Sequence, residues 1–329
     1  MQKNLINHFK KAILSQDYTF EELALDIFRF QYQHNIVYQQ FTNALNLSIN
    51  NINSIKEIPF LPIEVYKNHT IKSTDFIAEK IYKSSGTGDS GRSKHHVADN
   101  DFYLQHALNL FTDSYGSVED FIIIAILPSY QEQGESSLIA MVDYFIQKSG
   151  NKLSGYYLGK RTEIDGLLPS LHRSGKKILI LGVTYALLEL AENKPDFSGF
   201  IVMETGGMKG RRREIIREEL HRYLCDSFNV ESIHSEYGMT ELMSQAYSKE
   251  KGHFRLPKSM KILIRDVNDP FHYISNDKTG GINIIDLANI YSCSFIETKD
   301  LGRSLKGDFY EIMGRFDNSD LRGCNLLLI

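Results

Sequence analysis

Apolar side chains recur every three to four positions through the first 57 residues, which is the spacing of one helix face. The clearest run consists of Phe20, Leu23, Ala24, Ile27, Phe28 and Phe30. Pro59 and Pro62 then end the pattern, because proline removes an amide donor and blocks a helix interior. We therefore expect a helical region over residues 1–57, followed by a segment, Ile58–Tyr66, that crosses into a core.

Beyond this region, strand and helix patterns alternate along the chain. Short apolar runs predict strands at Ile81–Lys83, Phe121–Leu127, Ile178–Leu181, Phe200–Met203 and Val230–His234. Helical spacing predicts helices at Asp101–Phe111, Ser136–Gln147, Thr184–Glu192 and Arg213–Leu224. Strands that alternate with helices favour a mostly parallel sheet with helices on its faces.

The pattern changes from Met260 onward. Three short strands, Lys261–Ile264, Ile282–Ile285 and Ser292–Ile296, are separated by turn residues and by no helical pattern. This predicts a small β subdomain. We expect an α/β fold with three parts: a helical region at 1–57, an α/β core at 58–259 and the β subdomain at 260–329.

Composition narrows the class of function only modestly. Apolar residues make up 42% of the 329 residues, enough for a sizeable core, and the formal net charge is −4. A nucleic-acid-binding protein would need a basic patch, and the densest basic run, Lys209–Arg213, lies beside Glu214, Glu218 and Glu219. We expect no nucleic-acid partner.

The chain has three cysteines, Cys225, Cys293 and Cys324, and no pair of them has the spacing of zinc ligands. A sparse, odd set is not a disulfide framework. No apolar run approaches the roughly 20 residues that a membrane span requires. We expect a cytoplasmic protein without a membrane span.

A glycine-rich segment follows the first predicted strand of the core. It reads Lys83-Ser-Ser-Gly-Thr-Gly-Asp-Ser-Gly-Arg-Ser-Lys94, and we expect a helix after it. Glycines allow a close backbone approach, and amides, hydroxyls and basic side chains can then face a phosphate. The Gly-Lys-Ser/Thr ending of a Walker loop is absent. A flexible polar turn is the alternative.

A second polar segment, Ser235-Glu-Tyr-Gly-Met-Thr-Glu241, follows the strand predicted at Val230–His234. Ligands of open α/β sheets bind at the carboxyl ends of strands. Thr240 can hydrogen-bond a phosphate, and the carboxylate of Glu241 can bind Mg²⁺, which prefers oxygen ligands. A capped helix start is the alternative.

A third candidate lies near the C-terminal end. Glu297-Thr-Lys-Asp-Leu-Gly-Arg303 is followed by Gly314-Arg-Phe-Asp317. Asp300 is a suitable acceptor for both hydroxyls of a ribose. Two acidic β-turns are the alternative.

The order of these segments resembles that of the adenylate-forming superfamily of acyl-CoA and aryl-CoA ligases. The resemblance covers about residues 58–329 and rests on five ordered motifs. Two of them, Glu204-Thr-Gly-Gly207 and Tyr237-Gly-Met-Thr-Glu241, are similar to the adenine-pocket segment and to the Tyr-Gly-x-Thr-Glu motif. The resemblance implies ATP and Mg²⁺ as cofactors, with Glu241 on the metal. It implies that ATP contacts Ser84, Ser85, Gly86, Thr87, Gly88, Ser90, Gly91, Arg92, Lys94, Glu204, Thr205, Gly206, Gly207, Tyr237, Gly238 and Asp300.

Within the superfamily the chain looks most like the LuxE-type acyl-protein synthetases, relatives of the phenylacetate-CoA ligases. The resemblance rests on Ile58-Pro-Phe-Leu-Pro62, on Leu127-Pro-Ser-Tyr130 with Ser136 and Ser137, and on the ending Arg322-Gly-Cys324. Such enzymes adenylate a fatty acid, carry the acyl group on a cysteine near the C-terminus and pass it to a reductase. Cys324 is similar to that cysteine.

The resemblance also implies catalytic roles for Cys324, Thr240 and Glu241, and Arg315, close to Cys324 in sequence, would favour its thiolate. Tyr130 and Gln133 follow a predicted strand end, and His234 and Ser235 precede the Tyr-Gly motif, so we expect these four residues to line an acyl pocket. The substrate would be a small-molecule carboxylic acid. The acceptor would be Cys324 followed by an acyl-reductase, an acyl-carrier protein, or CoA. A CoA ligase in which Cys324 is idle, and a non-catalytic acyl- or nucleotide-binding subunit, are the alternatives.

Three features depart from the superfamily pattern. The glycine-rich loop reads Gly-Thr-Gly-Asp-Ser-Gly, where the superfamily has Gly-Thr-Thr-Gly, and Lys299 replaces the glycine of the Thr-Gly-Asp motif. The superfamily also carries a catalytic lysine on a C-terminal lid domain. The sequence stops at Ile329, so we expect that domain to be absent or vestigial.

Overall fold

The structure is a computed structural model that describes residues 2–85, 91–129, 134–206, 216–274 and 277–315. The chain forms two compact units. The first unit contains Met1–Phe102, Glu241–Ser244 and Leu256–Ile329, and the second contains Tyr103–Thr240 and Gln245–Arg255. The three segments predicted from the sequence, 1–57, 58–259 and 260–329, describe changes of pattern and stay a prediction.

The first unit begins with the helices that the apolar spacing predicted. Its elements before the glycine-rich segment are α1 (Gln2–Ser15), α2 (Phe20–His34), α3 (Ile36–Ala44), η1 (Ile49–Asn51), β1 (Leu61–Pro62) and α4 (Val65–Asn68). Asn35 ends α2 and caps α3, because its side chain accepts a hydrogen bond from the Tyr38 amide. The rings of Phe28 on α2 and Tyr38 on α3 both pack against Phe295.

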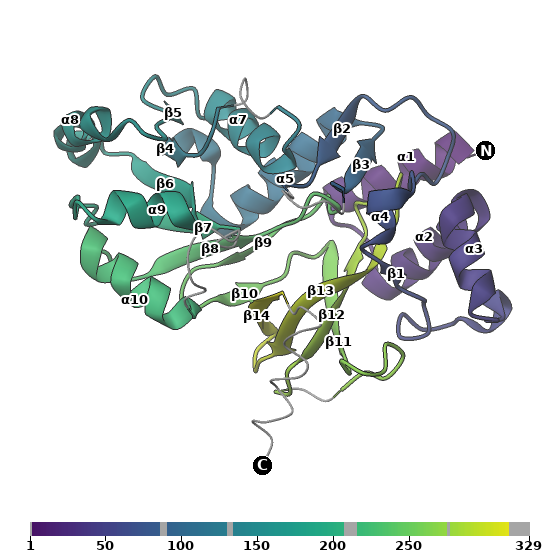
Figure 1. Ribbon diagram of the computed structural model, residues 1–329. Helices are drawn as coiled ribbons and strands as arrows, with labels where there is room; N and C mark the ends of the chain where they lie inside the picture. Colours follow the sequence, from purple (N-terminus) through teal and green to yellow (C-terminus); the bar gives the residue numbers. More distant parts are fainter. Residues whose placement is uncertain (1, 86–90, 130–133, 207–215, 275–276, 316–329) are drawn as a thin grey trace, which may run out of the picture. The chain divides into compact units, whose positions relative to one another are not determined.

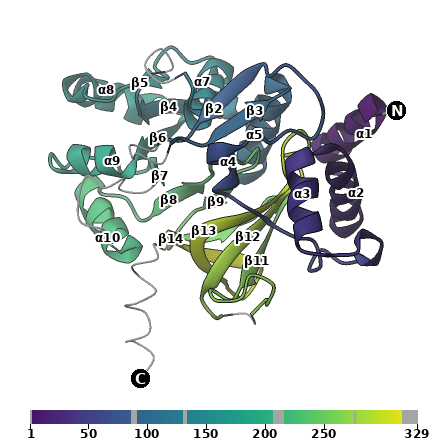
Figure 2. The same ribbon diagram turned by 45° about the vertical axis from the view of Figure 1, so that its right-hand side comes forward.

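The sheet of the first unit is antiparallel except at one edge pair. It runs in the order β11 (Met260–Arg265), β12 (Gly280–Asp286), β13 (Phe295–Ser304) and β14 (Phe309–Arg315), with β1 paired to β13 in parallel. The strands lie side by side in both views (Figures 1 and 2). A separate hairpin, β2 (Lys80–Lys83) with β3 (Lys94–Val97), flanks the glycine-rich segment.

The second unit is a helix-flanked sheet whose order is β10-β9-β8-β7-β6-β4-β5. Its strands are β4 (Phe121–Ile126), β5 (Gly155–Tyr156), β6 (Lys177–Val183), β7 (Ile201–Thr205), β8 (Ile233–Tyr237), β9 (Ala246–Ser248) and β10 (His253–Arg255). The pairs from β5 to β8 are parallel, whereas β9 and β10 are antiparallel to their neighbours. The predicted mostly parallel sheet is therefore confirmed for this part of the chain.

Helices and a 3-10 turn accompany this sheet (Figure 1). They are α5 (Asn100–Tyr115), η2 (Val118–Asp120), α7 (Ser137–Ser149), α8 (Arg161–Arg173), α9 (Thr184–Ala191) and α10 (Arg217–Phe228), the first three residues of α5 belonging to the first unit. Buried aromatic contacts tie Phe111 on α5 to Phe121 on β4 and to Phe145 on α7. None of the helices in the described ranges is long and apolar enough to cross a membrane.

Three expectations about local structure were wrong. A strand, β3, follows the glycine-rich segment, and the helix begins only at Asn100. Strand β8 starts at Ile233 and includes Ser235–Tyr237, so these residues end the strand and do not follow it. Strand β13 starts at Phe295, and Asp300 lies within it and not in a turn. The sequence patterns also gave no sign of α8 or β14, among others.

Candidate functional site

Two charged residues of the first unit that the sequence singled out, Asp300 and Arg315, lie near Glu241. Its side chain is buried, and burial raises the pKa of its carboxyl group. A hydrogen bond from Ser93 and the charge of Arg315 oppose the rise, whereas the charge of Asp300 adds to it. Glu241, Asp300 and Arg315 lie close enough to influence one another although they are up to 74 residues apart in sequence.

Asp300 lies on β13 opposite Arg315 on β14. The distance between Arg315 Nε and Asp300 Oδ1 is 3.7 Å, and Asp300 is buried while Arg315 is largely exposed. The Asp300 amide donates a hydrogen bond to Thr298 Oγ1 (3.1 Å). This arrangement presents one fixed carboxylate beside one exposed cation, a combination that suits a ligand with hydroxyls and phosphates.

The hairpin β2–β3 fixes the two ends of the glycine-rich loop. The Ser84 amide donates to the Ser93 carbonyl (3.0 Å), and the Ser93 amide donates to Ser84 Oγ (3.0 Å). The Arg92 guanidinium bonds back to the carbonyls of Lys83 and Ser84, Gly91 has a positive φ of 77°, and Lys94 is exposed. Ser85 is exposed, and Gly86, Thr87, Gly88 and Ser90 lie outside the described residues.

Loop residues 286–293, between β12 and β13, hold Glu241 in place. The Asn289 side chain donates to the carbonyls of Glu241 and Cys293 (both 2.8 Å), and its oxygen lies 3.1 Å from His95 Nε2. The fully buried Asp286 carboxylate accepts hydrogen bonds from the amides of Met243 (2.7 Å) and Ser244 (2.9 Å). Sequence reasoning missed Asp286, Asn289 and Ser93, because a periodicity argument treats polar residues as exposed.

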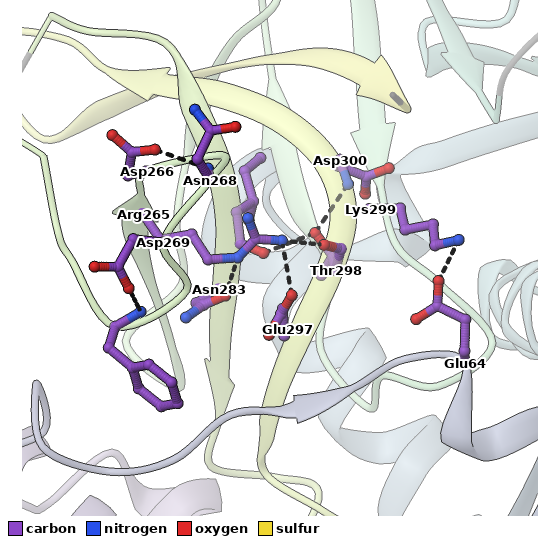
Figure 3. Close-up of polar contacts among 12 residues, drawn as sticks. Glu64, Arg265, Asp266, Asn268, Asp269, Asn283, Glu297, Thr298, Lys299 and Asp300 are labelled. Carbon is purple, nitrogen blue, oxygen red and sulfur yellow. Dashed lines mark hydrogen bonds and ion pairs between the residues drawn. The ribbon is translucent and has the colours of Figure 1, made fainter. Parts of the chain in front are cut away.

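Arg265 forms a buried polar cluster beneath the Asp300 strand (Figure 3). Its guanidinium donates to Asn283 Oδ1 (3.0 Å) and to the Thr298 carbonyl (2.9 Å), and it lies 3.2 Å from Glu297 Oε1. Burial lowers the pKa of Arg265, and the charge of Glu297 opposes this. The cluster was not predicted, although an arginine that ends the apolar run Met260–Arg265 was a visible signal.

In the second unit, the remaining candidate residues for nucleotide and acyl binding lie on both faces of the sheet. Residues on a strand point alternately to opposite faces, so His234 and Glu236 share one face of β8, and Ser235 and Tyr237 share the other. His234 and Ser235, expected together in an acyl pocket, therefore point in opposite directions. Tyr130, Gln133 and Gly207 lie outside the described residues.

On one face, Glu204 is a buried and compensated carboxylate. Arg217 Nε and His221 Nε2 of α10 each lie 3.6 Å from its Oε1, and Thr184 Oγ1 donates to Oε2 (3.3 Å). Burial opposes its ionisation, but the neighbouring side chains of His221 and Ser235 and the charge of Arg217 hold the pKa of Glu204 below its usual value. Thr184 Oγ1 also donates to the Gly206 carbonyl (2.7 Å), which fixes the end of β7.

Tyr237 and Thr240 complete the candidates on the second unit. The Tyr237 ring lies 6.0 Å from the Phe254 ring, and the Arg217 guanidinium lies over Phe254 at 5.4 Å. Thr240 is half-buried, whereas Gly238 is exposed. The Tyr237 side chain thus joins the face that carries Glu204 and α10.

On the opposite face, Glu236 is buried and lacks such compensation. Thr205 Oγ1 donates to Glu236 Oε2. Burial raises the pKa of Glu236 to about 7, with the hydrogen bond from Thr205 opposing and the charge of Glu204 adding to the rise. Nearby, the Tyr115 hydroxyl lies 3.0 Å from His234 Nδ1, and burial, helped by Lys249, lowers the pKa of His234 to about 4.

Within the described ranges, no group of three or more histidine, cysteine, aspartate and glutamate side chains is placed to hold a metal ion by itself. A single carboxylate is enough for Mg²⁺ when substrate phosphates supply further ligands. Glu241 fits this role, because burial makes its ionisation unfavourable and a divalent cation would offset that cost. Cys324 lies outside the described residues.

No protein-family model matches this chain, and no match was found among curated protein sequences. Solved structures do match its fold. One is 2-hydroxyisobutyryl-CoA ligase in the postadenylation state with 2-HIB-AMP, at a TM-score of 0.64 and 11% identity over 94% of this chain and 68% of that one. Another is ATP-bound MatB from Rhodopseudomonas palustris, at a TM-score of 0.52 and 14% identity over 83% of this chain and 52% of that one.

An ATP-bound RpMatB-BxBclM chimera gives a TM-score of 0.53 at 14% identity, over 83% of this chain and 52% of that one. The chain thus spans about half the length of the MatB structures. At these identities the likeness concerns the fold. It confirms the predicted α/β fold of adenylate-forming enzymes, with a large sheet flanked by helices.

The Arg265 cluster leads to a test by a paired glycine substitution. A Cβ on Gly281 would lie 1.9 Å from Arg265 Nη1, so Gly281→Ala should displace the guanidinium and lower the free energy of unfolding by about 1–3 kcal/mol. Gly166 in α8 has no atom within 4 Å of such a Cβ, and Gly166→Ala should leave stability unchanged or raise it by up to about 1 kcal/mol. Urea unfolding midpoints measure both, and equal effects would contradict a rigid cluster.

Glu236 leads to a test by pH. Its native pKa of about 7 exceeds the ordinary value of 4.5, so the native state binds the proton more tightly than the unfolded state. The stability it contributes is present below pH 4.5 and is lost as pH rises through about 7, by up to about 3 kcal/mol. Glu236→Gln removes this titration. The stability of the variant relative to wild type should therefore increase across that range in urea unfolding, and a constant difference would refute the shift.

Proposed function

We propose that this chain activates a carboxylic acid with ATP as an acyl-adenylate. The observation that carries the proposal is the gathering of Glu241, Asp300 and Arg315 in the first unit, with Ser93 beside them. These residues come from segments whose resemblance to the adenylate-forming superfamily implied roles in binding Mg²⁺ and ribose, and from the motif Gly314–Asp317. The fold shared with 2-hydroxyisobutyryl-CoA ligase and MatB supports the same reaction class.

In the proposed reaction a carboxylate oxygen of the acid attacks the α-phosphorus of ATP. The bond from this phosphorus to the bridging oxygen breaks, and pyrophosphate leaves. The carboxylate of Asp300 accepts hydrogen bonds from the ribose hydroxyls, and the exposed guanidinium of Arg315 balances phosphate charge. Glu241 holds Mg²⁺, which would supply charge neutralisation when bound. The Ser84–Lys94 loop contacts the other phosphates.

The role of Asp300 gives the direct test. Asp300→Asn should lower kcat/KM for ATP by about 10- to 100-fold in carboxylate-dependent ATP–pyrophosphate exchange, because a hydrogen bond to a charged acceptor contributes about 1.5–3 kcal/mol. Asp269→Asn is the matched control, since Asp269 is exposed and its carboxylate accepts a hydrogen bond from the nearby Phe271 amide. Absence of exchange with every acid would refute adenylation and leave a binding subunit.

For the second step, we propose that the mixed anhydride is attacked by a thiol, that of Cys324. The new bond joins the thiolate sulfur to the acyl carbon, and AMP leaves with the former anhydride oxygen. The support is the likeness of the ending Arg322-Gly-Cys324 to the LuxE-type acyl-protein synthetases. The other cysteines are less suited, because burial raises the pKa of Cys293 to about 12 and also raises that of Cys225.

Mass spectrometry distinguishes the possible acceptors. After incubation with ATP, Mg²⁺ and an acid that supports exchange, the intact chain should gain one hydroxylamine-labile acyl group. Cys324→Ala should abolish this gain while ATP–pyrophosphate exchange continues, and Cys225→Ala should retain it. A CoA thioester formed without any acylated protein would favour a CoA ligase and overturn the assignment of Cys324.

A further inference from the structure

A second carboxylate, separate from the Glu241 group, lies on one face of the second unit's sheet. Glu236 on β8 is paired in register with Tyr247 on β9, so the two side chains stand on the same face. Gln245 precedes Tyr247 by two positions and shares that face. A Cβ on Gly238 would come within 2.5 Å of Glu236 Oε1 and 3.6 Å of Gln245 Cβ, which places the two side chains side by side.

Two polar atoms of this group are buried and have no hydrogen-bond partner among the described residues. They are Gln245 Oε1 and the Tyr247 hydroxyl oxygen. Gln245 Nε2 approaches Met141 Sδ, a weak acceptor, so exchanging the two amide atoms would set the oxygen against the sulfur and still leave one polar atom unpaired. Buried polar atoms in folded proteins nearly always have a hydrogen-bond partner, so these two atoms indicate that a partner is missing.

The charge of Glu236 is also uncompensated. Within the described residues no lysine, arginine or histidine lies within ion-pair distance of its carboxylate, whereas Glu204 on the opposite face has both Arg217 and His221. The missing partner should therefore be a cation that also donates hydrogen bonds. An ammonium group has three donors and no acceptor, which matches a carboxylate oxygen, an amide oxygen and a hydroxyl oxygen.

The group lies close to the surface and next to candidate site residues. Gly238 is exposed, it lies directly over Glu236 Oε1, and it belongs to the Tyr-Gly-Met-Thr-Glu motif. His234, a candidate for the acyl pocket, shares the face of Glu236. The Tyr115 ring lies 5.6 Å from the His234 ring and 5.4 Å from the Tyr247 ring. An unsubstituted alkyl chain on this face would leave Gln245 Oε1 and the Tyr247 hydroxyl without partners and the carboxylate of Glu236 without a counter-charge.

We propose that the acid activated by this chain carries a protonated amine, which pairs with Glu236 and donates hydrogen bonds to Gln245 and Tyr247. This inference rests on the proposed adenylation and names its substrate class. Glu236 supplies the negative charge that pairs with the ammonium group, and Gln245 and Tyr247 accept hydrogen bonds from it. The aromatic rings of Tyr115 and Tyr247 provide the surface against which the carbon chain packs.

The experiment compares matched acids in ATP–pyrophosphate exchange. Short straight-chain acids are assayed unsubstituted, with a hydroxyl group and with an amino group, the substituent being placed at each chain position in turn. We expect the best amino acid to exceed the unsubstituted acid of the same length by at least about tenfold in kcat/KM, as one well-formed ion pair would allow. An unsubstituted or hydroxylated acid that does equally well or better overturns the proposal.

Variants then test which residues recognise the amine. Glu236→Gln should lower kcat/KM for the amino acid by about 10- to 100-fold and change that for the unsubstituted acid by less than about threefold. Tyr247→Phe removes one hydroxyl and should reduce the same preference to a smaller extent, and it serves as the test should Glu236→Gln not fold. Glu231→Gln, at an exposed glutamate near the start of β8, should leave the preference unchanged.

Failure of this inference differs from failure of the proposed function. Exchange with unsubstituted acids and no gain from an amine refutes the amine while adenylation stands. If Glu236→Gln lowers kcat/KM equally for the amino-substituted and the unsubstituted acid, Glu236 has a structural role, and recognition of the amine is also refuted. Exchange with no acid at all refutes adenylation and the inference with it.

Discussion

The arrangement of the first unit depends on one buried carboxylate, that of Asp286 at the end of β12. Its Oδ2 accepts hydrogen bonds from the amides of Met243 and Ser244, and its Oδ1 accepts from Ser244 Oγ (2.6 Å) and the Ala288 amide (3.1 Å). Burial raises the pKa of Asp286, and these four donors oppose the rise. A fully buried carboxylate is tolerated only with such a complete set of partners.

This interaction determines where Glu241 lies. Residues Glu241–Ser244 belong to the first unit, while the residues on either side of them belong to the second. Asp286 holds the end of this short segment, and Asn289, three residues later, holds its beginning through the Glu241 carbonyl. The same loop is anchored from the other side by Gln31 on α2, whose amide donates to the carbonyls of Asn289 and Ile290. The N-terminal helices therefore contribute to the site by fixing the loop that fixes Glu241.

The sequence predicts well those elements whose periodicity reflects burial. Strands β4 and β6 are continuous apolar runs, and α7 and α9 have clear helical spacing, so their positions followed from pattern alone. The glycine-rich, Tyr-Gly and Asp300 segments were also visible as polar interruptions in that pattern. Helix α8 was not predicted, because it contains Gly166 and Pro169, residue types that have low helix propensity.

Other elements depend on partners far away in sequence, which a local pattern does not contain. Ser235–Tyr237 are polar, yet they continue β8 because Glu204 and Thr205 of β7 pair with them on one side and β9 pairs on the other. Glu297–Arg303 resembles a turn in sequence, but pairing with both β12 and β14 makes it a strand. Likewise, the burial of Arg265 became evident only once Asn283, Glu297 and Thr298 were placed around it.

Strand β8 finally shows how one short element separates two kinds of buried acid. The face shared by Ser235 and Glu204 is completed by α10, which brings Arg217 and His221 to the carboxylate. The face of Glu236 carries aromatic and thioether side chains, and Lys249 lies over the Tyr115 ring, but within the described residues no cation lies within ion-pair distance of the Glu236 carboxylate. Since both glutamates are buried to a similar degree, burial alone does not explain their opposite pKa shifts. The difference is the counter-charge, which the fold supplies to Glu204 and which, in our proposal, the amine of the substrate supplies to Glu236.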